Sequence, residues 1–513
     1  MPNIQQIPVP GSKLIKIRGD KITFRLTLPP QDHATAWLRS NIGYASVRRT
    51  EIINRREQNL PILASDWTDT PMHHKGKGVF ELTVHLLETG VFEAKTYFIK
   101  PGSDTPIWPH GDNTIIKVEP WQYSEANSIY SAFTRQFGAG RFPTNNDHDR
   151  EELLNNLEQE GFTVIPRSGT FRDLTKQLDF IINELGFNII QLLPIHPSPT
   201  TYARMGRYGS PYAVLDYMNV DSALAEFDKK TTPLEQFQEL LDATHARGAR
   251  LILDIPINHT GWGSKLQIEH PEMFTRAPDM SFQSPGAWGV IWEDLAQLDY
   301  SQRELWYYMA DVFLFWCRRG VDGFRCDAGY MIPLPVWKYI VAKVRREYPD
   351  TLFFLEGLGG KIKVMKELLE NANLNWAYSE LFQNYDRQQV ERYLKHWSDI
   401  SEHSGNLIHF AETHDNNRLA AISEINARMR TALSALTSRN GAFGITAGVE
   451  WFAKQKINVH GAPSLNWGSQ NNQIKLIARL NKILKKHPAF GHDAKLSLIH
   501  KDDGTGIVLR RTG

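Results

Sequence analysis

The sequence predicts a (β/α)8 barrel preceded by an all-β sandwich, and three patterns lead to this prediction. Residues 14 to about 120 form short runs that alternate apolar and polar positions, as antiparallel strands do. From residue 126 onward, eight apolar runs alternate with helical stretches. Four of those runs end in polar residues, which is typical of buried parallel strands that open into a site. A doubly wound open sheet is the alternative, but it needs fewer strands and usually a glycine-rich phosphate turn, and the sequence shows neither.

The amino-terminal sandwich is expected over residues 1–122. Clusters of Gly, Pro and Asp separate its clearest strand runs, which are KITFRLTL (21–28), GVFELTVHL (78–86), GVFEAKTYFI (90–99) and NTIIKVEP (113–120). Three tryptophans of this domain could form a sugar-stacking surface, although packing within or between domains is the favoured interpretation. They are Trp37, Trp67 and Trp108.

The catalytic barrel is expected over residues 123–488. Its strands are predicted near 128–137, 187–194, 250–258, 321–327, 351–356, 375–381, 406–412 and 441–447. Helical stretches between them include 170–186, 233–248, 303–320, 335–349 and 472–488, several of which end in Gly, Pro or basic residues.

Two further segments interrupt or follow the barrel pattern. Residues 261–302 are rich in Trp, Pro and Gly, and a segment of this length at the active face of a barrel is usually a lid or a small subdomain. Residues 489–513 lose the helical pattern and suggest a hairpin with its turn at Asp503-Gly504. We therefore expect the start of a carboxyl-terminal β domain that is truncated.

The composition excludes several classes of partner. Lys and Arg total 58 and Asp and Glu total 57, so no net charge favours nucleic acid or an anionic membrane. The only cysteines, Cys317 and Cys326, are expected to be buried thiols, which fits a reducing compartment. The first residues lack the pattern of a signal peptide, and no apolar run is long enough to span a bilayer. We expect a soluble cytoplasmic protein, of undetermined oligomeric state.

Four strings carry the chemistry. They are LILDIPINH (251–259), VDGFRCDA (321–328), LFFLEG (352–357) and ETHD (412–415). Because the strands of a barrel end at one face, these strings bring Asp254, Arg325, Asp327, Glu356 and Asp415 together. Such a carboxylate cluster suits the transfer or hydrolysis of a glycosidic bond.

Two of these carboxyl groups end neighbouring strands, the fourth and the fifth, as the two carboxyl groups of a retaining glycosidase would. Arg325 points to the same face as Asp327 and should keep it ionised. Glu356 has apolar neighbours, which should raise its pKa and suit a proton donor. Asp415 can stabilise an oxocarbenium-like transition state, and His259 and His414 can donate hydrogen bonds to sugar hydroxyls. Asp254 has a supporting role as the favoured interpretation.

The four strings resemble the signature regions of the α-amylase family, glycoside hydrolase family 13. The resemblance covers about 130–490 and implies that Asp327 is the nucleophile, Glu356 the acid/base and Asp415 the transition-state stabiliser. The stretch SPYAVLDY (210–217) is similar to the family's loop after the second strand, which makes Tyr212 the aromatic platform under the sugar. Asp254, His259, Arg325 and His414 are then substrate-binding residues.

The motifs that distinguish the members of this family from one another give a less direct answer. GTFRDL, IHPSP, HPEMF and FLFWCRRGVDGFRCD resemble the maltosyltransferases that extend α-1,4-glucans from maltose-1-phosphate. That resemblance implies the loss of a His after the third strand and of one before the last Asp, whereas this chain keeps His259 and His414. We therefore expect a retaining hydrolase of α-1,4-glucans such as starch, glycogen and maltodextrins.

Several alternatives stay open. They are glucan transfer, maltosyl transfer from maltose-1-phosphate, α-1,6 debranching and a non-catalytic glucan-binding protein. Phosphate recognition could use Arg204, Arg207, Lys361 and Lys363, although ordinary solvated loops are the favoured interpretation.

No cofactor is required by this chemistry. Many α-amylases follow the nucleophile with a Lys-His pair that serves a calcium ion, but Ala328-Gly329-Tyr330-Met331 stands here. We predict no usual metal site, although Asn258 could ligate calcium through its side-chain oxygen.

Overall fold

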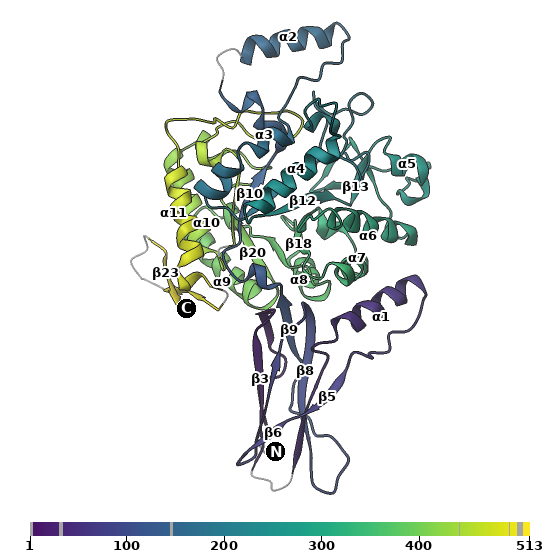
Figure 1. Ribbon diagram of the computed structural model, residues 1–513, viewed down its shortest axis with the longest axis vertical. Coiled ribbons are helices and arrows are strands. Elements are labelled where there is room, and N and C mark those ends of the chain that lie inside the picture. The colour runs from purple at the N-terminus through teal and green to yellow at the C-terminus, as the bar shows by residue number, and fades with distance from the viewer. Residues whose placement is uncertain are drawn as a thin grey trace.

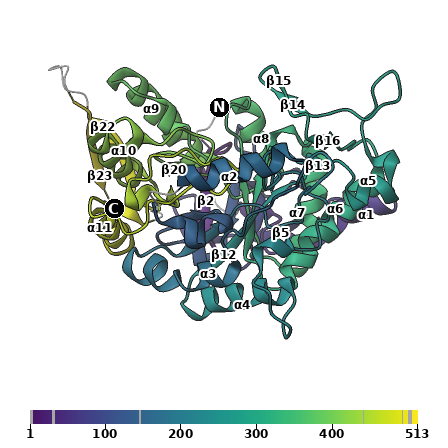
Figure 2. The same cartoon turned by 90° about the horizontal axis from the view of Figure 1, so that it is seen from above.

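The molecule has an amino-terminal β domain that extends from one end of a (β/α)8 barrel (Figure 1). The computed structural model describes residues 4–29, 34–143, 147–440, 442–491, 493–499 and 506–512. Seen from above, the helices surround the barrel strands (Figure 2). The predicted fold class, a barrel preceded by β sheets, is confirmed.

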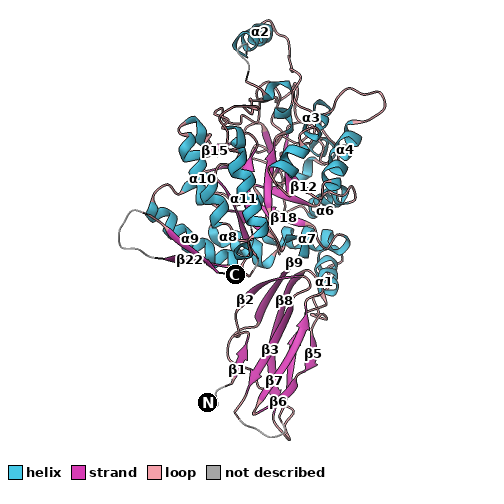
Figure 3. Ribbon diagram, turned by 60° about the vertical axis from the view of Figure 1, so that its left-hand side comes forward, coloured by secondary structure: helices cyan, strands magenta, loops and turns pink. Residues whose placement is uncertain are grey.

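The amino-terminal domain pairs two sheets around a core of its own (Figure 3). One sheet has the order β1 (Gln5–Ile7), β3 (Lys21–Thr27), β7 (Val79–His85), β6 (His73–Gly76). The other has the order β2 (Lys13–Ile17), β9 (Thr114–Glu119), β8 (Gly90–Ile99), β4 (Thr35–Ser40), β5 (Thr68–Pro71). The alternation in the sequence corresponds to burial, because β3 buries every second side chain: Ile22, Phe24 and Leu26.

One element of this domain differs from the prediction. Helix α1 (Ala45–Glu57) follows β4, where only strands were expected. Two of its side chains, Ala45 and Ile53, are fully buried, so the chain carries only a weak helical hydrophobic pattern there. The helix lies along α7 (Leu334–Glu347) of the barrel, and that contact is invisible in the sequence.

The barrel is closed by eight parallel strands in chain order. They are β10 (Ser128–Ala132), β11 (Ile189–Leu192), β12 (Arg250–Pro256), β17 (Gly323–Asp327), β18 (Leu352–Leu355), β19 (Trp376–Tyr378), β20 (Asn406–Phe410) and β21 (Phe443–Thr446). All eight lie within the predicted ranges, although β10 ends early and a 3-10 turn covers Thr134–Phe137. Aromatic and branched side chains such as Ile252, Phe354 and Phe410 fill the interior, so the barrel is a packed core.

Helices follow the strands and cover them from outside. They are α3 (Phe171–Thr175) with a π-helical segment (Asp179–Glu184), α4 (Pro233–Ala246), α6 (Arg303–Cys317), α7, α8 (Ile362–Asn371), α9 (Arg387–His403), α10 (Glu424–Thr437) and α11 (Ile474–Lys486). Thr170 and Thr232 begin α3 and α4 with capping boxes, each accepting from the third helical amide. Helix α2 (Asp147–Gln159) projects from the barrel on the side opposite the β domain (Figure 1).

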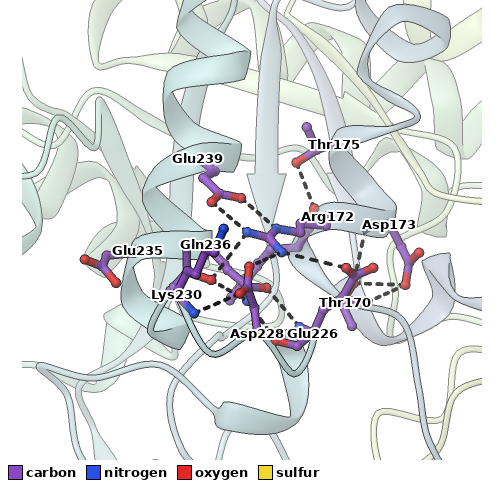
Figure 4. A network of polar contacts seen from close by, with 12 residues as sticks. Thr170, Arg172, Asp173, Thr175, Glu226, Asp228, Lys230, Glu235, Gln236 and Glu239 are labelled. Atoms are coloured by element: carbon purple, nitrogen blue, oxygen red, sulfur yellow. Dashed lines mark hydrogen bonds and ion pairs between the residues drawn. The ribbon is translucent and has the colours of Figure 1, made fainter.

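A polar network fastens α3 to the segment before α4 (Figure 4). The Arg172 guanidinium donates two hydrogen bonds to Glu239, both at 2.8 Å, and one to Asp228 at 2.9 Å. Asp228 lies in the connection between β11 and α4, which also carries Tyr212. The network therefore holds the far end of a loop that reaches the barrel's polar face.

The segment 261–302 is folded. Strand β13 (His259–Gly261) pairs antiparallel with β16 (Leu295–Gln297), and β14 (Gly286–Ala287) pairs with β15 (Val290–Ile291). A short helix, α5 (Lys265–Glu269), lies between them in sequence. The pairing of β13 and β16 holds the segment in place immediately after the carboxyl end of β12 in the chain.

The carboxyl-terminal hairpin consists of β22 (Lys495–Ile499) and β23 (Val508–Thr512), while the predicted turn at Asp503-Gly504 lies outside the described residues. Cys317 and Cys326 are buried and unpaired, as expected. In the described part of the chain, no helix has the length and apolar character needed to cross a membrane.

Charged side chains, one of them buried, join the β domain to the amino-terminal end of the barrel. Lys117 on β9 donates to the carbonyl oxygens of Leu374 at 2.6 Å, Ser404 at 2.9 Å and Leu369 at 3.0 Å. Arg18 forms two hydrogen bonds, 2.8 and 2.9 Å long, with the Asp350 carboxylate. These contacts reach the segments that precede the barrel strands, so they lie at the amino-terminal end of the barrel.

Candidate active site

The structure brings the predicted side chains together at the carboxyl ends of the barrel strands. Asp254 pairs in register with Arg325, and Cys326 pairs with Leu355. The residues that follow, Asp327 and Glu356, are therefore neighbours on adjacent strand ends. Side chains at paired positions of parallel strands point to the same face, so both carboxyl groups face the site.

Arg325 is the buried centre of the site. Its Nη1 atom lies 2.9 Å from both carboxylate oxygens of Asp254 and 2.5 Å from Oδ1 of Asp327. Burial alone would lower the pKa of Arg325, but the two carboxylates raise it well above its ordinary value. The guanidinium therefore forms ion pairs with the side chains of both Asp254 and Asp327. Asp254 is buried and holds the guanidinium in place.

Glu356 has the opposite environment. Burial raises the pKa of its carboxyl to about 8, with the charge of Arg325 opposing this and the charge of Asp327 adding to it. One oxygen, Oε2, accepts a hydrogen bond of 2.8 Å from the backbone N–H of Ala328. Because Oε2 is occupied as an acceptor, the proton of the neutral acid is placed on Oε1. Glu356 is thus a protonated acid at neutral pH, as its apolar neighbours predicted.

The backbone conformation of Ala328 makes that hydrogen bond possible. Its φ of 45° and ψ of 28° lie in the left-handed region, which costs a residue with a Cβ about 1 kcal/mol. The turn directs the amide that follows Asp327 at Glu356 on the next strand. The sequence contains no signal for this conformation, since alanine is not a residue that favours it.

Tyr212 joins three parts of the chain. Its hydroxyl donates to Oδ2 of Asp254 at 3.0 Å and lies 2.8 Å from Nε2 of His414. Because the single hydroxyl proton goes to Asp254, His414 is the donor in the second contact and carries its proton on Nε2. The two rings are nearly parallel, with centroids 5.9 Å apart. Burial lowers the pKa of His414, which keeps it neutral.

One predicted residue just after β12 is buried with unused polar atoms. His259 is 2% exposed, and neither of its ring nitrogens has a close hydrogen-bond partner among the described residues. Burial lowers its pKa, so the ring is neutral and offers one donor and one acceptor. Its ring packs edge-to-face against the ring of Trp292 in segment 261–302, with the two ring centroids 5.9 Å apart. These free atoms fit a residue that binds a polar ligand such as a sugar hydroxyl.

Asp415 lies at the rim of the site. Its side chain is 62% exposed, against 15% for Asp327, and its Oδ2 is 3.4 Å from Nε2 of His414. The third carboxylate is therefore open to an incoming ligand rather than locked into the Arg325 network.

Two aromatic residues at the mouth were not predicted. Trp288 in segment 261–302 is 67% exposed, and its indole N–H donates a hydrogen bond to the carbonyl oxygen of Gly359 at 3.4 Å. Its ring centroid lies 6.5 Å from that of Tyr330, which is three residues after Asp327. The only sequence signal was the high aromatic content of 261–302. The pair forms an exposed aromatic surface beside both central carboxyl groups.

The four basic residues considered for phosphate recognition have different surroundings. Arg207 pairs with Glu151 at 2.6 Å and with Glu158 at 3.2 Å, and Arg204 pairs with Glu158 at 3.4 Å. Helix α2 thus neutralises both arginines. Lys361 is exposed where α8 begins, and Lys363 is 87% exposed and lies 4.0 Å from Glu367. The two lysines remain available near the Gly357–Gly360 turn.

The described residues contain no cluster of three or more His, Cys, Asp or Glu side chains arranged to hold a metal ion. The side-chain nitrogen of Asn258 is buried without a partner, but no carboxylates gather beside it among the residues that the structure describes. Calcium binding by Asn258 stays a prediction, and nothing in the described donor set supports it.

Fold and site together define a (β/α)8 barrel with a paired-carboxylate site at the strand ends. The family model "Alpha amylase, catalytic domain" matches residues 126–282. The crystal structure of an α-amylase from Lactobacillus plantarum superposes with a TM-score of 0.59 and 25% identity, over 76% of this chain and 85% of that one. Residues 126–282 are therefore similar to the α-amylase catalytic domain, and the resemblance to the α-amylase family is confirmed.

The curated relatives of this chain include maltosyltransferases. The α-1,4-glucan:maltose-1-phosphate maltosyltransferase of Cereibacter sphaeroides is 27% identical over 349 residues, which is 63% of this chain and 51% of that protein. The enzyme of the same name from Pseudomonas aeruginosa is 27% identical over 355 residues, with the same shares. The chain spans about half the length of these relatives. The partial resemblance to maltosyltransferases is confirmed, whereas the preference for hydrolysis is not.

Proposed function

We propose that this protein is a retaining enzyme that cleaves α-1,4-linked glucans such as starch, glycogen and maltodextrins by double displacement. The observation that carries the proposal is the pairing of Asp327 with Glu356 on adjacent strand ends. Arg325 forms an ion pair with the first, and burial raises the pKa of the second to about 8. One nucleophile and one acid, side by side, are what retention requires.

In the first step an Asp327 oxygen forms a bond with the anomeric carbon, and the bond from that carbon to the leaving oxygen breaks. Glu356 gives its proton to the leaving oxygen, so the products are a glycosyl ester of Asp327 and an ionised Glu356. Esterification removes the negative charge of Asp327, one of the causes that raise the pKa of Glu356. The loss of that charge helps Glu356 to remain ionised for the second step.

In the second step Glu356 takes a proton from water or from a sugar hydroxyl. The oxygen so activated attacks the anomeric carbon, and the ester bond to Asp327 breaks with retention. Asp415, with its exposed carboxylate, would stabilise the positive charge on the sugar ring in both transition states. Tyr212, His259 and His414 would position the sugar.

Maltosyl transfer from maltose-1-phosphate to an α-1,4-glucan is the second candidate, and the names of the curated relatives favour it. Here the leaving group is phosphate, which departs without full protonation. Arg204 and Arg207 are neutralised by α2, so they are poor candidates for the phosphate, and Lys361 is the better one. Glucan transfer and α-1,6 cleavage use the same two carboxyl groups and differ in the sugars bound around them.

The deciding experiment is incubation with maltoheptaose alone, followed by chromatography of the product lengths. Shorter products only would support hydrolysis, and shorter and longer products together would support glucan transfer. No change, followed by phosphate release from maltose-1-phosphate with glycogen, would replace the first candidate by the second. Inactivity with both donors would favour α-1,6 cleavage or a glucan-binding protein, and branched glucan separates those two.

A further inference from the structure

A cleft of about 720 Å³ lies between the β domain and the barrel, away from the strand ends that carry the candidate active site. Helix α1 forms one wall, and α6 and α7 form the other. Figure 1 shows α1 lying beside α7 and below α6. A volume of this order matches the clefts that bind small molecules.

The charge of this cleft is strongly one-sided. Nine Lys and Arg residues line it against four Asp and Glu residues, although the whole chain has 58 and 57. The imbalance therefore belongs to this cleft and not to the composition.

The four carboxylates of the lining are already engaged by other groups. Glu51 accepts from the backbone N–H groups of Ala64 and Ser65. Asp66 accepts from Asn41, Glu93 from Asn113 and Glu370 from Lys13. Glu370 and Glu93 thereby also pair with two cations of the lining, Lys13 at 2.7 Å and Arg48 at 3.8 Å, and they form no ion pair with the other cations.

Three cations of the lining form no ion pair with any described residue, although the charge of Glu304 acts to raise the pKa of Arg56. Arg56, Arg303 and Lys338 make no side-chain hydrogen bond or ion pair with any described residue, and the Nε atoms of both arginines are buried without a partner. Arg56 lies over the ring of Trp306, with its Cζ 3.4 Å from the centroid, so its position is well defined. Unpaired cations held in a partly buried cleft are costly.

Cations of the β domain and of the barrel also repel each other across the cleft, Arg56 with Arg303 and Arg48 with Lys338. Burial first and Arg303 second lower the pKa of Arg56, and burial first and Arg48 second lower the pKa of Lys338. Arg303 is in addition the first residue of α6, where the helix dipole disfavours a positive charge. Glu57 of α1 holds the walls together through Lys343 and Tyr339 of α7, and an anion bound between the walls would relieve the remaining repulsion between their cations.

We propose that this cleft binds a phosphate-bearing small molecule whose phosphate lies between Arg56, Arg303 and Lys338. Guanidinium and ammonium groups are the usual partners of phosphate, and the first turn of α6 adds to the positive potential. Ile52, Ile62 and Trp67 line the same cleft and would contact the rest of the molecule. The ligand would bridge the β domain and the barrel and thereby stabilise their contact. The proposal does not depend on the reaction at the strand ends.

The test is calorimetric titration of the intact protein with inorganic pyrophosphate at constant ionic strength. Saturable binding to one site is expected, with about tenfold weaker binding in Arg303→Gln and in Lys338→Gln, because each variant loses a charge-assisted hydrogen bond. Lys482→Gln, at an exposed lysine of α11 outside the cleft, is the matched control and should bind as the wild type does. No saturable binding, or equal affinity in all variants, would overturn the proposal.

A second measurement keeps the interpretation independent of folding. Without ligand, Arg303→Gln should unfold at the same temperature as the wild type or at a higher one, because it removes the repulsion with Arg56. Pyrophosphate should raise the unfolding temperature of the wild type and of Arg303→Lys, but not that of Arg303→Gln. A large fall in the unliganded Arg303→Gln variant would show that the cation stabilises the fold itself, and it would contradict the proposal.

Discussion

Two fully buried cations, Arg325 and Lys117, lie at opposite ends of the same barrel and have different partners. Arg325, at the carboxyl ends of the strands, contacts two carboxylates, one of which also faces the open site. Lys117, at the amino-terminal end, contacts the backbone carbonyl oxygens of three segments, and its carboxylate neighbour, Glu119, is itself buried. Burial of a charge is thus common to both ends.

The partners show what each cation does. The two carboxyl groups that share the Arg325 guanidinium lie at the strand ends, where a charged group can take part in chemistry. Carbonyl oxygens have no protonation state to change, so the Lys117 cage can only hold the segments before β19 and β20 against β9. Both buried cations carry a desolvation cost. At one end the buried charge contributes to the candidate active site, and at the other it holds the two domains in contact. Variants at each end should separate loss of activity from loss of stability.

The largest effect is expected for Asp327→Asn. The variant removes the proposed nucleophile but keeps its volume, so turnover of the glucan or maltosyl donor should fall by about 10⁴-fold or more. Because glucan contacts remain, affinity for maltoheptaose should be retained, which calorimetry would measure. Unchanged turnover would refute the assigned role, and loss of both binding and folding would place Asp327 in the same structural class as Lys117.

The Glu356→Gln variant tests whether Glu356 is the acid and whether its pKa is raised in the folded state. The folded-state pKa of about 8 lies above that of an unfolded carboxyl, so the favourable contribution is full below about pH 4.3 and lost as pH rises through about 8. The variant, which stays neutral, should match the wild type in unfolding temperature near pH 4 and exceed it at pH 9. Glu367→Gln, at an exposed carboxylate, should show no such difference.

The activity of Glu356→Gln sharpens the choice of donor. Cleavage of maltoheptaose needs a proton on the leaving oxygen and should fall by about 10³-fold. The first step with maltose-1-phosphate should fall much less, because phosphate is a good leaving group. Equal losses with both donors would argue against an acid role for Glu356.

Lys117→Met should lower the free energy of unfolding by about 3 kcal/mol, because it leaves buried carbonyl oxygens without a donor. Turnover per folded molecule should not change, since the residue is at the far end of the barrel. Urea unfolding compared with activity would show both, with Lys363→Met as the exposed control. Reduced turnover in fully folded protein would break the distinction between the two ends.

The smallest effect is expected for Trp288→Ala at the mouth. Loss of the exposed ring beside Tyr330 should weaken glucan binding by about 1 kcal/mol, a few-fold rise in KM, with little change in kcat. Steady-state kinetics with maltoheptaose would measure this, and Trp292→Ala, next to His259 inside the site, is the comparison. A fall in kcat without a change in KM would assign Trp288 a role in the reaction itself.

The sequence by itself determined the barrel, its eight strands and the set of polar residues at the strand ends. Buried parallel strands are recognisable as local apolar runs, and their carboxyl ends must meet at one face. Local patterns alone therefore predict that Asp327 and Glu356 lie side by side. The apolar neighbours of Glu356 likewise predicted its raised pKa.

Only the tertiary structure decided the contacts between residues far apart in the chain. Helix α1 has few buried side chains, and its contacts with α7 determine its position. The carbonyl cage of Lys117, the neutralisation of Arg207 by α2 and the contact of Tyr212 with His414 each join segments that no local pattern relates. Electrostatic and hydrogen-bonding partners depend on distance in space, and a periodic pattern records only which face of an element is buried.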